Sequence, residues 1–297
     1  MTAKEYARSL SRRMLAPLVR AGLQPDGSIL RSQITGSDHV EVLSAPGGFF
    51  AGLDCLADEY QRVALQHLGE NASRVDMIPI VYLPLLDLHA IVEPTPSREL
   101  YIALHWGTAL HLRYVFELFM NYSTYDTDDP WDKSFSTADY AGGLLDIAAF
   151  MVNEDFELFR RAAMMTNPAS THSKVYAAAV RVTNTYILLH EYGHVLLGHF
   201  DETDGPSAGN NDDRDGQVMN SNQQKELDAD RFALQKFLAS SKRPLRHTAL
   251  ACDVGILMRF LDLAQRFGTS GSPQTATQTH PPARERWRNL KLLFSTE

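Results

Sequence analysis

Hydrophobic residues recur every three to four positions along most of the chain, and this spacing predicts a mainly helical protein. A helix with that pattern buries one face and exposes the other. Gly69 and Gly198 stand at the ends of two such segments and are suited to end a helix, because glycine readily adopts the left-handed backbone conformation. Helices are expected over residues 3–22, 50–69, 108–120, 141–165, 174–198, 223–240, 244–267 and 282–294.

Two segments in the first half of the chain have the composition of strands. Residues 77–92 and 99–105 are rich in Ile, Val, Leu and Tyr, and Pro-Thr-Pro at 94–96 separates them. They predict a hairpin with a long turn. The expected fold is therefore α+β and predominantly helical: a zincin-like catalytic core with a small sheet in the N-terminal half.

Polar segments suggest how the chain is organised. Residues 1–137 are expected to form an N-terminal region that contributes the sheet, and residues 138–297 a helical core. Residues 201–222 and 268–279 carry hardly any apolar anchor and are expected to be exposed, the first of them flexible. Because segment 201–222 joins two long helices it could act as a lid, but its composition favours a solvated spacer.

Composition and charge exclude some classes of function. The 297 residues are 44% hydrophobic and 22% charged, which is ordinary for a globular protein with a substantial core. The formal net charge of −8 argues against nucleic-acid binding, which depends on basic surface. Cys55 and Cys252 form neither a disulfide framework nor a Cys-x-x-Cys site, so the chain suits a reducing cytoplasm.

No segment has the character of a membrane anchor. The N-terminus is charged and lacks the apolar run of a secretory signal. The most apolar stretch, residues 77–92, contains two prolines, Asp87 and His89, and is too short and too interrupted to span a bilayer. A cytoplasmic protein without membrane insertion is expected.

Residues 190–194, His-Glu-Tyr-Gly-His, contain the strongest chemical signal. His190 and His194 are four positions apart, so on a helix they lie about 40° apart around the axis and can bind one metal ion. Glu191 can reach a water on that ion and act as general base. The pattern is His-Glu-x-x-His, the zinc-peptidase motif, and the apolar residues around it predict a buried helix.

A catalytic zinc ion usually takes three protein ligands and one water, so a third ligand is needed. The metzincin motif would require Gly at 197 and His at 200, but the chain has Leu197 and Phe200. His199 lies about 180° around a continuous helix from His190 and could not share its metal. His199 is therefore interpreted as a polar residue at the helix end or a core histidine.

A carboxylate from the next helix is the better candidate. Glu226 and Asp230 are four positions apart and share one helix face. Glu226 can supply the third ligand, and Asp230 can accept the N–H of a ligand histidine, which fixes the orientation of its ring. The alternative is an acidic, solvated helix start, which is favourable near a helix N-terminus.

The segments 190–199 and 226–233 together resemble the gluzincin metallopeptidases, in particular the branch that holds the HtpX heat-shock proteases and the CAAX prenyl proteases. Residues 279–286, Thr-His-Pro-Pro-Ala-Arg-Glu-Arg, are similar to the Thr-His-Pro-x-x-x-x-Arg segment of that branch. This resemblance covers about the last 115 residues. It implies that His280 and Arg286 lie near the zinc and face the substrate or the tetrahedral intermediate; a loop histidine and a surface arginine are the alternatives.

Members of that branch largely carry transmembrane helices, which this sequence lacks. The chain also resembles the phage-exclusion Lit peptidases, soluble bacterial proteins with the same zinc motif. That resemblance implies an intracellular protease that acts on one host protein.

The expected function is thus a zinc-dependent endopeptidase of the gluzincin type, with Zn²⁺ as cofactor and a protein or peptide as substrate. Tyr186 and Tyr192 are weaker candidates for oxyanion donors, and the apolar strands at 99–105 or 77–83 are candidates for the substrate-binding edge. A zinc-stabilised regulatory or peptide-binding module is the alternative. Glu191 argues against it, because a structural zinc site has no use for a base. A hydrolase of non-peptide amides is a third reading.

Overall fold

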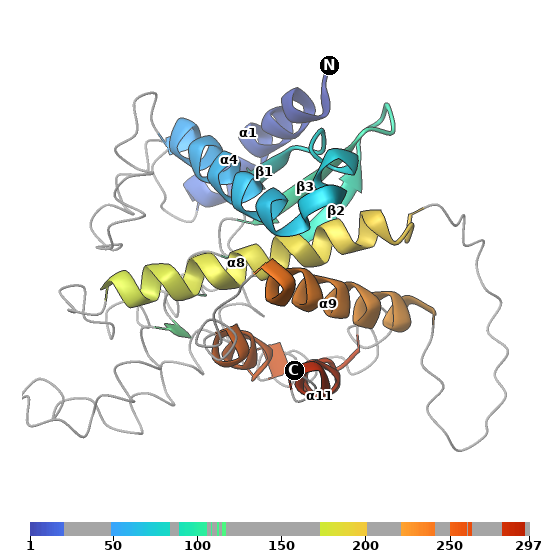
Figure 1. The fold of residues 1–297 in the computed structure, drawn as a ribbon. Helices are drawn as coiled ribbons and strands as arrows, with labels where there is room; N and C mark the ends of the chain where they lie inside the picture. Colours follow the sequence, from blue (N-terminus) through green and yellow to red (C-terminus); the bar gives the residue numbers. More distant parts are fainter. Residues whose placement is uncertain are drawn as a thin grey trace, which may run out of the picture.

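The computed structural model describes residues 1–20, 49–83, 89–105, 173–200, 221–240, 250–259 and 281–294, together with 108, 112, 115, 116, 261 and 262. Its elements are α1 (Ala3–Arg20), α4 (Phe49–Leu68), the 3₁₀ helix η1 (Gly69–Arg74), β1 (Ile80–Leu83), β2 (Ala90–Pro94), β3 (Leu100–His105), α8 (Ser173–Leu196), α9 (Ser221–Ser240) and α11 (Ala283–Phe294) (Figure 1). Residues 250–259 are also helical.

The three described strands form one mixed sheet in the order β1-β3-β2. β1 runs parallel to β3, and β2 runs antiparallel to it through the turn at residues 95–98. The sequence-based prediction of a single strand over 77–92 is therefore wrong, because that segment supplies two strands on opposite sides of β3. Arg98 has a positive φ of 65°, which lets this short hairpin close.

Helices cover both faces of the sheet. Alternate side chains of a strand point to opposite faces. One set, from β1 and β3, packs against Ala3 and Ala7 of α1. The other set belongs to the main core, to which α4, α8 and α9 also contribute. In Figure 1, α8 crosses the middle of the molecule, with the sheet and α4 on one side and α9 and α11 on the other.

This central position explains why α8 is apolar around much of its circumference. It contacts β2 and α4 on one side and α9 on the other. A Cβ atom on Gly193 would lie 3.3 Å from Cα of Ala229 and 3.1 Å from Cδ1 of Phe232. Glycine at this position therefore allows α8 and α9 to approach closely, which matters because both helices carry residues of the predicted metal site.

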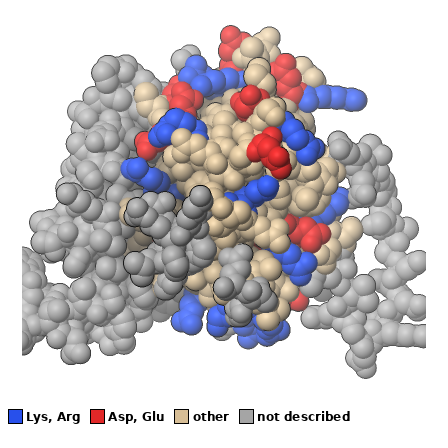
Figure 2. Space-filling view, viewed as in Figure 1, with Lys and Arg blue, Asp and Glu red and all other residues tan. Residues whose placement is uncertain are grey.

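The structure confirms a mostly helical fold with a small sheet, and it contains helices at 3–20, 49–68, 173–196, 221–240 and 283–294, close to the predicted bounds. The predicted helix at 141–165, the segment 201–220 and the domain boundary near 137 lie outside the described residues. None of the described helices is both long and apolar enough to cross a bilayer. Figure 2 shows acidic and basic side chains interspersed over the described part of the face in view.

Candidate metal centre and active site

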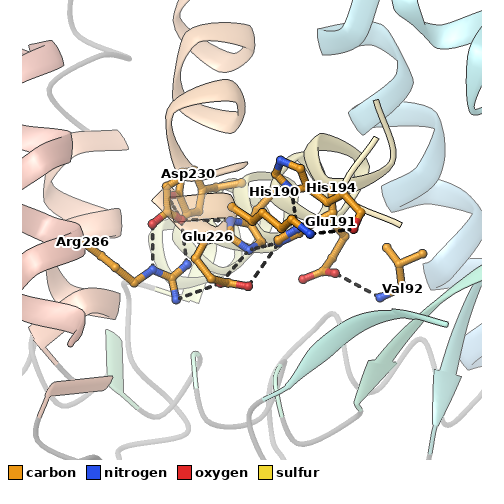
Figure 3. Close-up of polar contacts among 10 residues, drawn as sticks. Val92, His190, Glu191, His194, Glu226, Asp230 and Arg286 are labelled. Atoms are coloured by element: carbon orange, nitrogen blue, oxygen red, sulfur yellow. Dashed lines mark hydrogen bonds and ion pairs between the residues drawn. The ribbon is translucent and has the colours of Figure 1, made fainter. Parts of the chain in front are cut away.

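His190 and His194 face each other across one turn of α8. Their Nε2 atoms are 3.1 Å apart, and their ring centroids are 4.7 Å apart. At this distance, the lone pairs or protons of the two ring nitrogens point into the same small volume. Figure 3 shows that both imidazoles also contact Glu226. A single proton or a single cation between the two nitrogens satisfies both at once.

Glu226 reaches the same volume from α9. Its Oε2 atom lies 3.4 Å from Nε2 of His190, and its Oε1 atom lies 3.4 Å from Nε2 of His194. Among the described residues, these three side chains form a group whose candidate ligand atoms all lie within 4.8 Å of one another. The structure thus brings together the three residues that the sequence predicts as metal ligands.

The spacing of these atoms fits a tetrahedral zinc ion. Ligand atoms about 2.0–2.1 Å from a tetrahedral centre are about 3.3 Å from one another. The nitrogen–nitrogen distance is 3.1 Å, and the two nitrogen–oxygen distances are 3.4 Å. The donor set, two imidazoles and one carboxylate, is also one that zinc accepts in catalytic sites.

Asp230 holds the outer side of His190. Its Oδ1 atom lies 2.9 Å from Nδ1 of His190 and accepts a hydrogen bond from the hydroxyl of Tyr186, also at 2.9 Å. This contact orients the ring so that Nε2 points into the site. The structure therefore places Asp230 where the sequence predicts it, and it places Tyr186 against Asp230 instead of near a developing oxyanion.

Arg286 approaches the site from α11 and binds Asp230. Its Nε atom donates to Oδ2 and its Nη2 atom donates to Oδ1, both at 2.7 Å, and Nη1 lies 4.0 Å from Oε2 of Glu226. This bidentate contact uses the guanidinium edge formed by Nε and Nη2. The geometry favours a role for Arg286 in positioning Asp230, on the side away from the cavity. His280 lies outside the described residues.

The charges of this cluster are unbalanced without a cation. Glu191, Glu226 and Asp230 contribute three carboxylates, whereas Arg286 contributes one positive charge. Burial opposes a charge on His190, but Asp230 and Glu226 outweigh it and raise the pKa of His190 to about 10. Burial, followed by the charge on His190, lowers the pKa of His194 to about 3. Arg286 and protonated His190 then balance two of the three carboxylates, and a divalent cation in place of the His190 proton would balance all three.

Glu191 lies between α8 and the sheet. Its Oε2 atom accepts a hydrogen bond of 3.1 Å from the backbone N–H of Val92 in β2, and its side chain is nearly buried. Burial raises the pKa of Glu191 to about 7. Tyr192, the next residue, is fully buried in the core and packs there, so it is not placed to act as an oxyanion donor.

A cavity of about 430 Å³ opens over these residues. β2 forms one wall, the motif residues of α8 form its floor, and the first turns of α9 close it. β2 is the edge of the described sheet on this side, because β3 is central and β1 lies beyond β3. The prediction of 99–105 as a substrate edge is therefore wrong, because β3 is central; residues 80–83 form the other edge of the described sheet and do not line this cavity. The described lining is His89, Ala90, Ile91, Val92, His190, Glu191, His194, His199, Phe200, Asn222, Lys225 and Glu226.

His199 is the residue whose place the sequence analysis missed. Its Nδ1 atom lies 2.9 Å from Nδ1 of His194, and it lines the cavity. The angular argument treated the helix as continuous through residue 199, although Gly198 was expected to end it. Instead Gly198, with φ of 74°, turns the chain back, so that His199 lies over His194. The signal was present, since a glycine at a helix end reverses the chain direction.

Comparison with known proteins gives the class of the chain. The family model described as Peptidase U49 matches residues 106–297, which is more than half of the sequence. The chain belongs to the Peptidase U49 family. Its members are Lit-like peptidases, so the match agrees with the resemblance to the Lit peptidases and does not specifically support the HtpX and CAAX branch. No curated protein and no solved structure matches the chain.

Membership of Peptidase U49 makes the chain a peptidase and implies that its substrate is a protein. The matched range begins just after β3 and includes α8, α9 and α11, the helices that carry the metal cluster and its arginine. β2, which forms one wall of the cavity, lies before the matched range.

Proposed function

We propose that this U49 peptidase is a zinc-dependent endopeptidase of the gluzincin type. The observation that carries the proposal is the triangle formed by Nε2 of His190, Nε2 of His194 and the carboxylate of Glu226. The two nitrogens are 3.1 Å apart, and each lies 3.4 Å from a different oxygen of Glu226, which is close to the ligand spacing around a tetrahedral zinc ion. The excess negative charge of the buried cluster supports the same conclusion.

Each residue then has a defined task. His190, His194 and Glu226 hold the zinc ion, and Asp230 orients His190. When bound, zinc supplies Lewis acidity, which acidifies water and polarises a carbonyl group. Glu191 takes a proton from the attacking water and passes it to the leaving amine. Its hydrogen bond from Val92 holds the carboxylate at the boundary between the metal site and β2.

The substrate lies extended along the outer edge of β2. The carbonyl of His89 accepts from the N–H of His105, and the N–H of Thr95 donates to the carbonyl of Glu99. The backbone groups of the odd-numbered positions of β2 therefore face β3, and those of the even-numbered positions face outward. Ala90, with its N–H and carbonyl, and Val92, with its carbonyl, therefore present backbone groups toward the cavity, where a peptide can pair with them as an added strand; the N–H of Val92 is held by Glu191. Such pairing aligns a peptide bond with the motif residues on α8. His280 is the candidate for stabilising the oxyanion, and Arg286, through its two hydrogen bonds to Asp230, positions that carboxylate.

The first experiment separates metal binding from catalysis. Purified wild type should bind about one equivalent of zinc and lose activity when the ion is removed by a chelator. Glu191→Gln should bind the same amount of zinc and show no cleavage, because only the base is changed. Glu226→Gln should lose zinc as well. Full cleavage by Glu191→Gln would exclude the assignment of the base, and wild type without stoichiometric zinc would exclude the proposal.

The second experiment finds the substrate. Cells expressing wild type and cells expressing Glu191→Gln are compared by mass spectrometry of protein N-termini. The proposal expects at least one new terminus that appears only with wild type, and a synthetic peptide across that site should be cleaved by the purified protein.

A non-catalytic zinc module is the competing function, and the ligand count distinguishes it. A structural zinc ion is normally enclosed by four protein ligands, whereas a catalytic ion keeps one position for solvent. The described residues supply three ligand side chains, and a cavity lies beside them. X-ray absorption on the zinc-loaded protein should therefore report three protein ligands and one light oxygen donor; four protein ligands would favour the module.

A further inference from the structure

His199 is held over His194 by the way α8 ends. The N–H of Gly198 donates to the carbonyl of Val195 at 3.1 Å, and the N–H of His199 donates to the carbonyl of His194 at 3.0 Å. With Gly198 in the left-handed conformation, this pair of bonds is a Schellman motif. The motif fixes residue 199 relative to residue 194 through the backbone, so the contact between the two rings does not depend on a mobile loop end.

The two histidine ligands are supported unequally along α8. His190 lies a full turn inside the helix, and Asp230 contacts its Nδ1 atom at 2.9 Å. His194 lies in the last turn, where carbonyl groups lack intrahelical partners and helices fray. The corresponding contact at Nδ1 of His194 is made by Nδ1 of His199, also at 2.9 Å. The rings meet edge to face, with centroids 5.0 Å apart.

We propose that His199 is the positioning residue of His194: its Nδ1 accepts the Nδ1–H of His194 and so directs the Nε2 lone pair of His194 into the metal site. This inference rests on the proposed function. It completes an ordered row, Asp230–His190–His194–His199, in which each outer group holds the Nδ1 side of one ligand and both Nε2 atoms meet in the middle at 3.1 Å.

The direction of the hydrogen bond follows from the row. If His199 donated instead, Nδ1 of His194 would be an acceptor and the ring proton would sit on Nε2, where it would face Nε2 of His190 and block a cation. When His199 accepts the hydrogen bond, the proton of His194 lies on Nδ1 and the Nε2 lone pair of His194 is available to a metal ion. Outer partners of ligand histidines typically change metal affinity by about 10- to 100-fold when removed.

Two substitutions test the contact. His199→Asn places a carbonyl oxygen at the position of Nδ1 and so keeps a hydrogen-bond acceptor. His199→Leu keeps most of the side-chain volume and removes the acceptor. Zinc dissociation constants are measured by competition with a fluorescent chelator. We expect His199→Leu to weaken zinc binding about 10-fold or more and His199→Asn to stay within about 3-fold of wild type. Equal affinities for wild type and His199→Leu would overturn the proposal, as would equal losses in both variants.

A metal-free measurement keeps this test separate from the proposed function. In protein labelled with ¹⁵N at histidine rings, long-range ¹H–¹⁵N spectra show which nitrogen of His194 carries the proton. Wild type and His199→Asn should show the Nδ1–H form, and His199→Leu should shift toward Nε2–H. An Nε2–H form in wild type would refute the role of His199 even if zinc binds; the Nδ1–H form without any zinc binding would support the contact while refuting the zinc peptidase.

Discussion

Removal of the guanidinium at position 286 should destabilise the fold through Asp230. Asp230 is 1% exposed and accepts two hydrogen bonds of 2.7 Å from Arg286. In Arg286→Gln, the carboxylate keeps its contacts with Tyr186 and His190 but loses its only described positive partner of fixed charge. A buried carboxylate without such a partner is costly, because the low dielectric of the interior no longer offsets the loss of water.

The expected magnitude is about 3–5 kcal/mol of unfolding free energy, the cost of breaking a buried ion pair by removal of one partner. With a urea m-value of about 3 kcal/mol/M, the midpoint should fall by about 1.0–1.7 M. Arg288→Gln is the matched control, because Arg288 is exposed on the same helix α11. Its substitution should change the unfolding free energy by less than about 0.5 kcal/mol.

The assay is urea unfolding followed by circular dichroism, with a chelator in every sample so that loss of metal does not add to the difference. A double-mutant cycle with Asp230→Asn isolates the pair. The double variant should be less destabilised than the sum of the single variants, with a coupling energy of about 2 kcal/mol or more. A coupling energy near zero, or equal midpoints for Arg286→Gln and Arg288→Gln, would refute the reasoning.

Two further predictions concern the core around the site. Gly193→Ala should destabilise the protein by about 1–2 kcal/mol in urea unfolding and weaken zinc binding, because its Cβ would meet the Ala229 backbone at 3.3 Å and push α9 away from α8. Helix propensity alone predicts a gain in stability of about 1 kcal/mol, and such a gain would contradict this prediction. Asp253→Asn should stabilise the protein by up to about 4 kcal/mol at pH 8 and have little effect at pH 4. Burial raises the pKa of Asp253 from 3.8 to about 7, so wild type loses stability as pH rises through that range, whereas asparagine stays neutral. Equal pH profiles of the urea midpoint in wild type and Asp253→Asn would contradict the prediction.

The candidate metal ligands were predictable from sequence because their geometry is local. His190 and His194 are fixed relative to each other by the pitch of a single helix, and Glu226 and Asp230 by the pitch of another. Only one non-local assumption was needed, that the two helices pack face to face. The close approach at Gly193 fulfils it.

The failures concern features that a local pattern does not encode. Residues 77–92 have a continuous strand composition, but their division into β1 and β2 depends on pairing with β3 from both sides. The angular argument for His199 holds for an unbroken helix and did not foresee the contact with His194, because Gly198 reverses the chain two residues after α8 ends. Arg286 was predicted in the site, yet its contact with Asp230 depends on how α11 packs on α9.

The brevity of β2 limits how strongly a peptide can be held. On its outer side Ala90 offers an N–H and a carbonyl, whereas Val92 offers only its carbonyl, because Glu191 already accepts the N–H of Val92; Pro94 then ends the series of donors because proline has no N–H. At about 1 kcal/mol for each of these three groups, main-chain pairing yields about 3 kcal/mol, a dissociation constant of about 6 mM. Affinity for a particular target must then come from a docking contact remote from the scissile bond, so short peptides cut from that target should be far poorer substrates than the intact protein.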